Sequence, residues 1–252
     1  TVTTFKLAQG RKLSSMECHD LMCFIGQIVV VGGVRRSAMI SLSNLSDDRM
    51  RHAKSGQWWE TAPHRALANN SVSYSEKPDI ETFMREWTAL VESKSGERGI
   101  FNREASKKQA EKYGRRDPNY DFGTNPCSEI ILRPYQFCNL TEVVVRATDT
   151  YEDLKRKVKV ATILGTIQSS YTRFPYLRKV WQRNTEEERL LGVSLTGIMD
   201  NPLMTAVNSN LEKTLDNLRN VALATNHEYS DLLDIPQSAA ITCVKPSGTV
   251  SQ

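Results

Sequence analysis

The sequence predicts an α/β fold in which short apolar strands alternate with longer helices. Helical periodicity is clearest over residues 79–93, where apolar side chains recur at intervals of three and four. Strand-like stretches such as 69–74 and 140–145 stand between the helical ones. This alternation is typical of a parallel sheet or barrel covered by helices.

The first half of the chain contains several expected elements. Ser14 and Glu17 have the spacing of a capping box, and we expect the helix that they open to run through 29–31 and end at Gly32-Gly33. Further along, we expect strands over 38–42 and 69–74, helices over 79–93 and 102–112, and a loop over 114–123.

The second half continues the alternation. We expect strands over 130–132 and 140–145, a helix over 151–171, a helix from about 211 to 233 and a strand over 239–244. Thr185 and Glu188 form a second capping-box pattern, which predicts a helix through 190–198. The acidic run 186–188 would then complement the dipole at the start of that helix.

Charge and apolar patterning exclude some classes of protein, and the two ends of the chain suggest a further expectation. The 252 residues carry a formal net charge of +4, too small an excess to argue for a nucleic-acid partner. The longest apolar patch, 28–31, is far shorter than the roughly 18 residues of a membrane span. The start without Met and the end just after a polar turn lead us to expect an interior piece of a longer protein. Five cysteines without a secretory signal indicate reduced thiols in a cytoplasmic protein.

The segment Asn125-Pro-Cys127-Ser-Glu129 carries the densest chemistry in the sequence. If its backbone is extended, Asn125, Cys127 and Glu129 point to one side. That side would present an amide, a thiol and a carboxylate to one small molecule, with the thiol as nucleophile, redox group or hydrogen-atom carrier. The residues alone also allow a loop cysteine between solvated polar neighbours.

The other cysteines permit fewer roles. Cys138 follows Cys127 by eleven residues and could belong to a redox pair or be a buried small hydrophobe. Cys18, Cys23 and Cys243 lie in apolar helical or strand patterns, and we expect them in the core or on a helix face. The scattered histidines share no motif with a cysteine, so no metal site is predicted.

A glycine-containing turn follows the last expected strand. The residues Ser247, Gly248, Thr249 and Ser251 offer backbone N–H groups and hydroxyls that could hold phosphate oxygens. The same residues could also form a plain polar turn.

Several motifs in order resemble the large chains of ribonucleotide reductases. They are Gly33-Val-Arg-Arg-Ser-Ala38, Gly96-Glu-Arg-Gly-Ile-Phe-Asn102, the run from Asn125 through Cys138 to Glu142, Leu190-Leu-Gly-Val-Ser-Leu-Thr-Gly197 and Val244-Lys-Pro-Ser-Gly-Thr-Val-Ser-Gln252. The run from Asn125 to Glu142 is most similar to the monomeric, adenosylcobalamin-dependent class II ribonucleoside-triphosphate reductases. The eleven-residue gap between Cys127 and Cys138 also fits class II better than the diiron class I, in which the family spacing is longer. The resemblance implies that residues 1–252 are the central segment of one catalytic domain, a ten-stranded α/β barrel with a finger loop carrying the reactive cysteine.

The resemblance also implies roles for particular residues. Cys127 would be the thiyl-radical cysteine, Glu129 the carboxylate that takes the 3′-hydroxyl proton, and Asn125 the amide that holds that hydroxyl. Cys138 would be one thiol of the redox-active disulfide, with its partner outside this chain. The residues Ser247, Gly248, Thr249 and Ser251 would bind the phosphates of the substrate. We expect a sheltered position for the thiol, because a thiyl radical must be kept from water.

The implied cofactor is adenosylcobalamin and the implied substrate a ribonucleoside triphosphate or diphosphate. The implied partners are a thioredoxin-like reductant and deoxynucleotide effectors, and this segment alone is expected not to turn over. Two alternatives stay open at the level of sequence. One is a fragment of a class I large subunit, and the other is a truncated, non-catalytic nucleotide-binding module or one half of a split or intein-interrupted gene.

Overall fold

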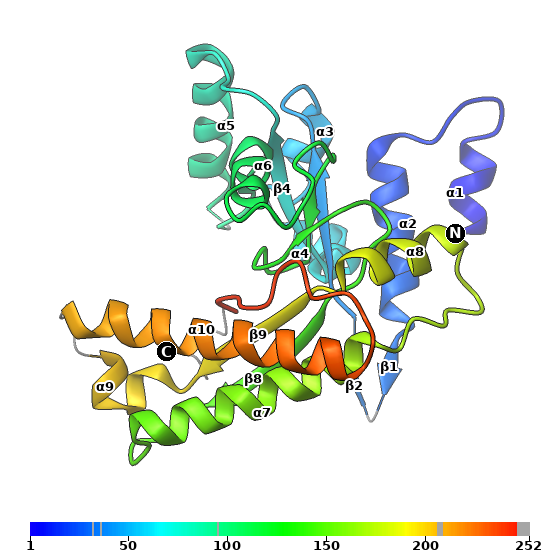
Figure 1. Ribbon diagram of the computed structural model, residues 1–252. Helices are drawn as coiled ribbons and strands as arrows, with labels where there is room; N and C mark the ends of the chain where they lie inside the picture. The colour runs from blue at the N-terminus through cyan, green and yellow to red at the C-terminus, as the bar shows by residue number, and fades with distance from the viewer. Residues whose placement is uncertain (32, 36, 95, 206–208, 246–252) are drawn as a thin grey trace. The chain divides into compact units, whose positions relative to one another are not determined.

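The computed structural model describes residues 1–31, 33–35, 37–94, 96–205 and 209–245 (Figure 1). The chain divides into two compact units. Unit 1 comprises Thr1–Lys108 and Gly123–Ser128, and unit 2 comprises Gln109–Phe122 and Glu129–Gln252.

Unit 1 is built around a parallel three-stranded sheet. The strand order is β3-β4-β5, with Met39 opposite Ala68 and Ser71 opposite Gly99. Helical segments connect the strands, as parallel pairing requires. The elements of this part of the chain are α1 (Val2–Leu7), α2 (Ser15–Gln27), β1 (Val30–Val31), β2 (Val34–Arg35), β3 (Met39–Ser43), α3 (Asp48–Arg51), α4 (Trp58–Thr61), the 3₁₀ helix η1 (Pro63–Leu67), β4 (Ala68–Tyr74), α5 (Ile80–Ser93), β5 (Gly99–Asn102), α6 (Arg103–Glu111, which runs on into unit 2) and β6 (Gly123–Thr124).

Unit 2 pairs two parallel strands and covers them with two long helices. Strands β8 and β9 run in register from Asn139 opposite Leu191 to Val144 opposite Thr196. Helices α7 and α10 lie side by side (Figure 1), and their apolar residues pack with Leu191 and Val193 in the largest buried cluster. The elements are β7 (Ile131–Leu132), β8 (Asn139–Val144), α7 (Tyr151–Ser169), α8 (Lys179–Glu188), β9 (Leu191–Thr196), the 3₁₀ helix η2 (Ile198–Asp200), α9 (Pro202–Thr205) and α10 (Ser209–Leu232).

The α/β class predicted from the sequence is confirmed, and so are most of the elements. Ser14 caps α2 in the predicted box, and Asp79 caps α5 through its side chain. The predicted strand over 239–244 is partly confirmed, because Leu191 and Val193 donate backbone hydrogen bonds to Ala240 and Ile241 beside β9. The ten-stranded barrel and the finger loop stay predictions.

Two predictions about local structure were wrong. Helix α2 ends at Gln27, and β1 and β2 form an antiparallel pair with Gly33 at a φ of +74° in the turn. A run of β-branched residues favours this extended pairing over more helix, and a positive φ favours glycine.

The predicted helix over 190–198 is instead the strand β9. Thr185 does not cap a helix that follows it, because it lies within α8 and its hydroxyl donates to the carbonyl of Trp181, near the start of that helix. Arg189, with a φ of +41°, ends that helix, and the acidic run 186–188 therefore lies at a helix C-terminus. The alternation of Leu191, Val193 and Leu195 is the period-two signal of a strand.

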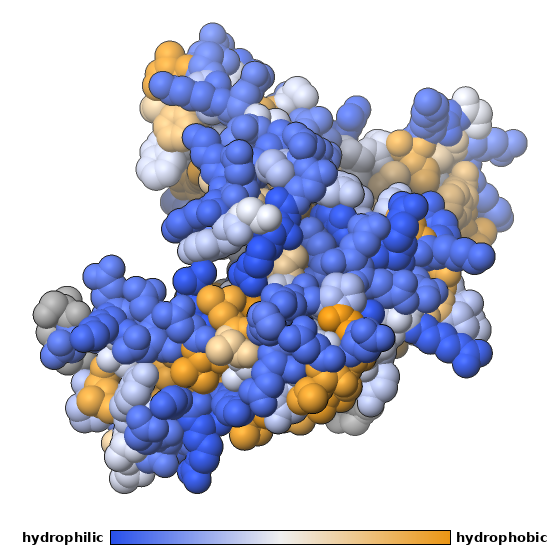
Figure 2. Space-filling view, viewed as in Figure 1, coloured by the Kyte–Doolittle hydropathy of each residue, from blue (hydrophilic) through white to orange (hydrophobic). Residues whose placement is uncertain are grey.

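None of the helices in the described ranges is long and apolar enough to cross a membrane. The apolar residues of α5 nevertheless lie largely outside the core of unit 1, and they form part of the apolar surface visible in Figure 2. They are Ile80, Met84, Trp87 and Val91.

Candidate active site

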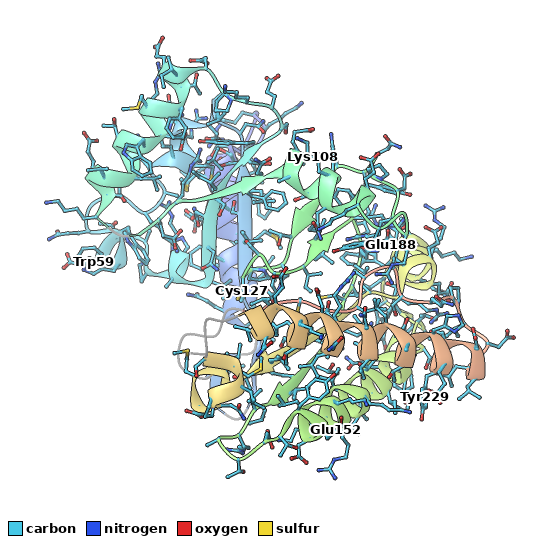
Figure 3. All side chains as sticks on the ribbon, turned by 60° about the vertical axis from the view of Figure 1, so that its left-hand side comes forward. Trp59, Lys108, Cys127, Glu152, Glu188 and Tyr229 are labelled. Atoms are coloured by element: carbon cyan, nitrogen blue, oxygen red, sulfur yellow. The ribbon has the colours of Figure 1, made fainter. Side chains whose placement is uncertain are left out.

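Cys127 lies in a tight turn of unit 1 (Figure 3). The amide of Ser128 donates to the Asn125 carbonyl at 2.9 Å, which closes a four-residue turn with Pro126 second and Cys127 third. Proline is favoured at that second position because its φ is already fixed near the value that the turn needs. The backbone is therefore not extended across this segment, so the condition for Asn125, Cys127 and Glu129 to point to one side is not met.

A side chain of β4 contacts the same turn. Asn69 donates from Nδ2 to the Pro126 carbonyl oxygen at 2.7 Å. Asn125 is half-buried, whereas Cys127 is exposed within this chain. The expectation of a sheltered thiol is not met in the described structure.

Glu129 belongs to unit 2, where its carboxylate is 1% exposed. Lys245 donates from Nζ to Glu129 Oε1 at 2.9 Å, and its own side chain is 30% exposed. Burial disfavours a charged carboxylate, and an ammonium group at hydrogen-bond distance favours it. The pair thus places a carboxylate that is shielded from water beside a counter-charge that is only partly shielded.

Two thiols lie in the same region of unit 2. Cys138 and Cys243 are half-buried and pack against a cluster that contains Ile130 and Leu190. Burial raises the pKa of Cys138, and the negative charge of Glu129 adds to that rise. Burial raises the pKa of Cys243 to about 12, with smaller contributions from Glu129 and Cys138. Both groups therefore stay protonated at neutral pH, which suits donors of hydrogen better than thiolate nucleophiles.

A cavity of about 270 Å³ opens beside Glu129 in unit 2. Charged or polar residues on its wall include Tyr113, Arg115, Arg116 and Arg219. Arg116 pairs with Glu188 at 2.8 Å, and Arg115 donates to the Ser238 carbonyl. The cavity therefore combines cationic side chains with the buried carboxylate.

The structure groups some predicted residues and leaves others undescribed. Cys138 lies close to Glu129. Lys245 and Cys243 also lie near Glu129, although the sequence alone did not assign them to the site. Lys245 carried no local signal, because 116 residues separate it from Glu129. The predicted phosphate-binding residues Ser247, Gly248, Thr249 and Ser251 lie outside the described residues.

No protein-family model matches the chain. Individual relatives do. The chain is 31% identical over 277 residues to the adenosylcobalamin-dependent ribonucleoside-triphosphate reductase of Lacticaseibacillus paracasei, with 96% of this chain and 35% of the relative covered. Enzymes of the same name from Lactobacillus gasseri and Lactobacillus leichmannii are 30% and 29% identical, each with 96% of this chain covered. The chain spans about 35% of the length of these relatives.

Solved structures agree with the sequence relatives. A B12-dependent class II ribonucleotide reductase matches with a TM-score of 0.70 and 25% identity, over 95% of this chain and 36% of that one. The class Id ribonucleotide reductase α subunit of Actinobacillus ureae matches with a TM-score of 0.57 and 12% identity, over 94% of this chain and 51% of that one, which shows a shared fold. The resemblance predicted from the motifs is confirmed along nearly the whole chain.

Proposed function

We propose that this chain, a homologue of class II ribonucleotide reductases over nearly its whole length, carries the reaction centre of a ribonucleoside-triphosphate reductase. The relatives bear that activity in their names. The observation that supports the chemistry most directly is the position of a buried carboxylate, Glu129, near the thiol of Cys138, whose pKa is raised by burial and by that carboxylate. On this proposal, residues 1–252 are the central segment of one catalytic domain.

The proposed reaction begins at the turn. Cys127, as a thiyl radical, removes the hydrogen atom from C3′ of the ribose, and the S–H bond forms as the C3′–H bond breaks. Asn125 orients the 3′-hydroxyl, and Glu129 takes its proton. The C2′ hydroxyl leaves as water with a proton from one thiol of a pair, the other thiol gives its hydrogen to C2′, and the two sulfurs join as a disulfide, whose electrons complete the reduction of the sugar. The proton on Glu129 returns to the 3′-oxygen, and Cys127 gives its hydrogen atom back to C3′, which restores the thiyl radical.

Cys138 is proposed as one thiol of that pair. Its partner is expected from outside this chain, as the resemblance to the class II reductases implies. A thioredoxin-like dithiol would reduce the disulfide after each turnover. A reducing cytoplasm suits the five free cysteines of the chain.

The proposed cofactor is adenosylcobalamin, after the names of the relatives. The exposed sulfur of Cys127 fits such a bulky group, since a corrin could approach only an accessible thiol. When bound, the cofactor supplies an organic radical able to take a hydrogen atom from a thiol.

The proposed substrate is a ribonucleoside triphosphate. Ser247, Gly248, Thr249 and Ser251 would hold its phosphates through backbone N–H groups and hydroxyls. Deoxynucleotide effectors are proposed as regulators of substrate choice.

The test is the substitution Cys127→Ser in the complete gene product, assayed with adenosylcobalamin, a dithiol and a ribonucleoside triphosphate. A serine O–H bond is too strong to serve as the hydrogen-atom carrier, so we expect no deoxynucleotide while nucleotide binding is unchanged. Cys18→Ser is the matched control, because Cys18 is also exposed but lies on α2. Turnover in the Cys127→Ser protein would refute the proposal.

A further inference from the structure

Lys245 and Glu129 form an ion pair that the proposed reaction does not yet use. The Nζ–Oε1 distance is 2.9 Å, and both residues belong to unit 2. The carboxylate is 1% exposed, so water gives it little stabilisation. A carboxylate in such a position tends to take up a proton unless a cation or hydrogen-bond donors favour its charge.

Few of the groups near Glu129 carry a positive charge that could stabilise its carboxylate. The thiols of Cys138 and Cys243 lie nearby, and Glu142 adds a further negative charge near Cys243. None of these three groups is a cation.

The cationic wall of the adjacent cavity is engaged with other partners. Arg116 pairs with Glu188, Arg115 donates to a backbone carbonyl, and Arg219 lies over the ring of Tyr113 at 4.6 Å. Lys245, by contrast, donates directly to Glu129.

We propose that Lys245 is a positioning residue that holds Glu129 as a carboxylate, ready to accept the 3′-hydroxyl proton. This inference rests on the proposed function, in which Glu129 is the base. Lys245 itself touches neither the sugar nor the reacting atoms in this role. It acts by fixing the charge and the direction of one carboxylate oxygen.

The role of Lys245 is tested by the pH dependence of kcat/KM in the complete gene product. An opposite charge within about 4–6 Å lowers a carboxyl pKa by about 1–3 units, so Lys245→Met should move the acidic limb of the profile upward by that amount. Below the limb, kcat/KM should fall by roughly 10-fold for each unit of the shift. Lys245→Arg keeps a cation and should return the limb to its original position.

Lys159→Met is the matched control. Lys159 is exposed on α7, and its nearest carboxylate, in Glu228, is 3.6 Å away. This variant should leave the profile unchanged. If the acidic limb of the Lys245→Met profile lies at the same pH as in wild type, the inference is overturned. A roughly tenfold rise in the KM for the nucleotide, with the acidic limb at the wild-type pH, would also overturn it, because Lys245 would then contact the phosphates of the substrate.

A second readout does not depend on turnover. The positive charge of Lys245 opposes the rise in the pKa of Cys138, so its removal should raise that pKa further and slow alkylation of Cys138 by iodoacetamide at pH 9. Lys245→Gln serves if the methionine variant does not fold. An unchanged alkylation rate in a folded variant would also overturn the inference.

The variant Glu129→Gln distinguishes a failure of the proposed function from a failure of the role proposed for Lys245. If Glu129→Gln retains full turnover, Glu129 is not the base and the proposed function fails. If Glu129→Gln is inactive and Lys245→Met keeps the original limb, the proposed function stands and only the role of Lys245 fails.

Discussion

Asn69 connects strand β4 to the turn that carries Cys127. Its Nδ2 donates to the Pro126 carbonyl, one residue before the cysteine. The turn is already closed by the bond from Ser128 to Asn125. The bond from Asn69 therefore adds a link to the sheet, which fixes where the closed turn points.

We predict that Asn69→Asp lowers kcat roughly 10- to 100-fold in the complete gene product, with little change in KM. Aspartate has the same shape but cannot donate to the carbonyl, and a displacement of about 1 Å at a reacting group can cost a factor of this size. Steady-state kinetics measure the change, and the rate of iodoacetamide labelling at Cys127 reports a displaced turn independently.

Asn220→Asp is the control for charge, because Asn220 is exposed on α10. It should behave as wild type. Equal kcat values for Asn69→Asp and wild type would show that the turn holds its position without this bond.

For single residues of the site, the sequence identifies the candidates more readily than their geometry. Asn125, Cys127 and Glu129 stand out by type and spacing, but an alternating pattern suggests an extended strand where Asn125 in fact begins a turn. The pairing of Lys245 with Glu129 spans 116 residues, and no local pattern encodes it.

Helix α5 shows how a buried charge can determine which face of an element turns inward. Glu86 is 2% exposed and accepts hydrogen bonds from Arg51 Nε at 2.6 Å and from Arg98 at 2.9 and 3.0 Å. Arg98 also donates to Ser43 at the end of β3. This cluster joins α3, α5 and the sheet, while the apolar residue Ile80 of α5 is 75% exposed.

We predict that Glu86→Gln lowers the free energy of unfolding of unit 1 by about 3–5 kcal/mol. The substitution removes the charge that two buried guanidinium groups share, and an uncompensated buried charge is costly. Hydrogen exchange of peptides from α5 and β3 in the complete gene product measures the loss.

Glu81→Gln on the same helix is the control. Glu81 is 82% exposed at its side chain and pairs with Arg85 at 3.2 Å, so its loss should cost no more than about 0.5 kcal/mol. Equal exchange rates in the two variants would contradict the view that Glu86 organises this unit.

The elements themselves were largely predictable, and the errors have physical causes. Helix α5 carries strong apolar periodicity, and both α5 and α7 begin at side-chain caps. In β9, Leu191, Val193 and Leu195 fit a strand, but the preceding Thr185 and Glu188 imitate a capping box. Glu188 instead pairs with Arg116, a tertiary contact 72 residues away that the local pattern does not contain.

The whole chain contains a separate buried polar network in each compact unit. Unit 2 has Glu188 with Arg116 and Gln136, whereas unit 1 has His19, whose Nδ1 lies 3.2 Å from Asp20. Asp20 also accepts two hydrogen bonds from Arg65. Because these networks carry different titratable groups, the stability of the two units should respond differently to pH.

Burial disfavours the charged ring of His19, but hydrogen bonds to Asp20 and Cys23 outweigh it and raise the pKa of His19 from 6.5 to about 9. The folded state therefore binds a proton that the unfolded state releases above pH 6.5. We predict that the free energy of unfolding of unit 1 falls by ~1.4 kcal/mol per pH unit between about 6.5 and 9. Hydrogen exchange of α2 peptides at several pH values, corrected for the intrinsic exchange rate, measures this slope.

His19→Gln should abolish this pH dependence, whereas His227→Gln, at an exposed position of α10, should leave it intact. The same slope in wild type and His19→Gln would show that another group in unit 1 binds the proton.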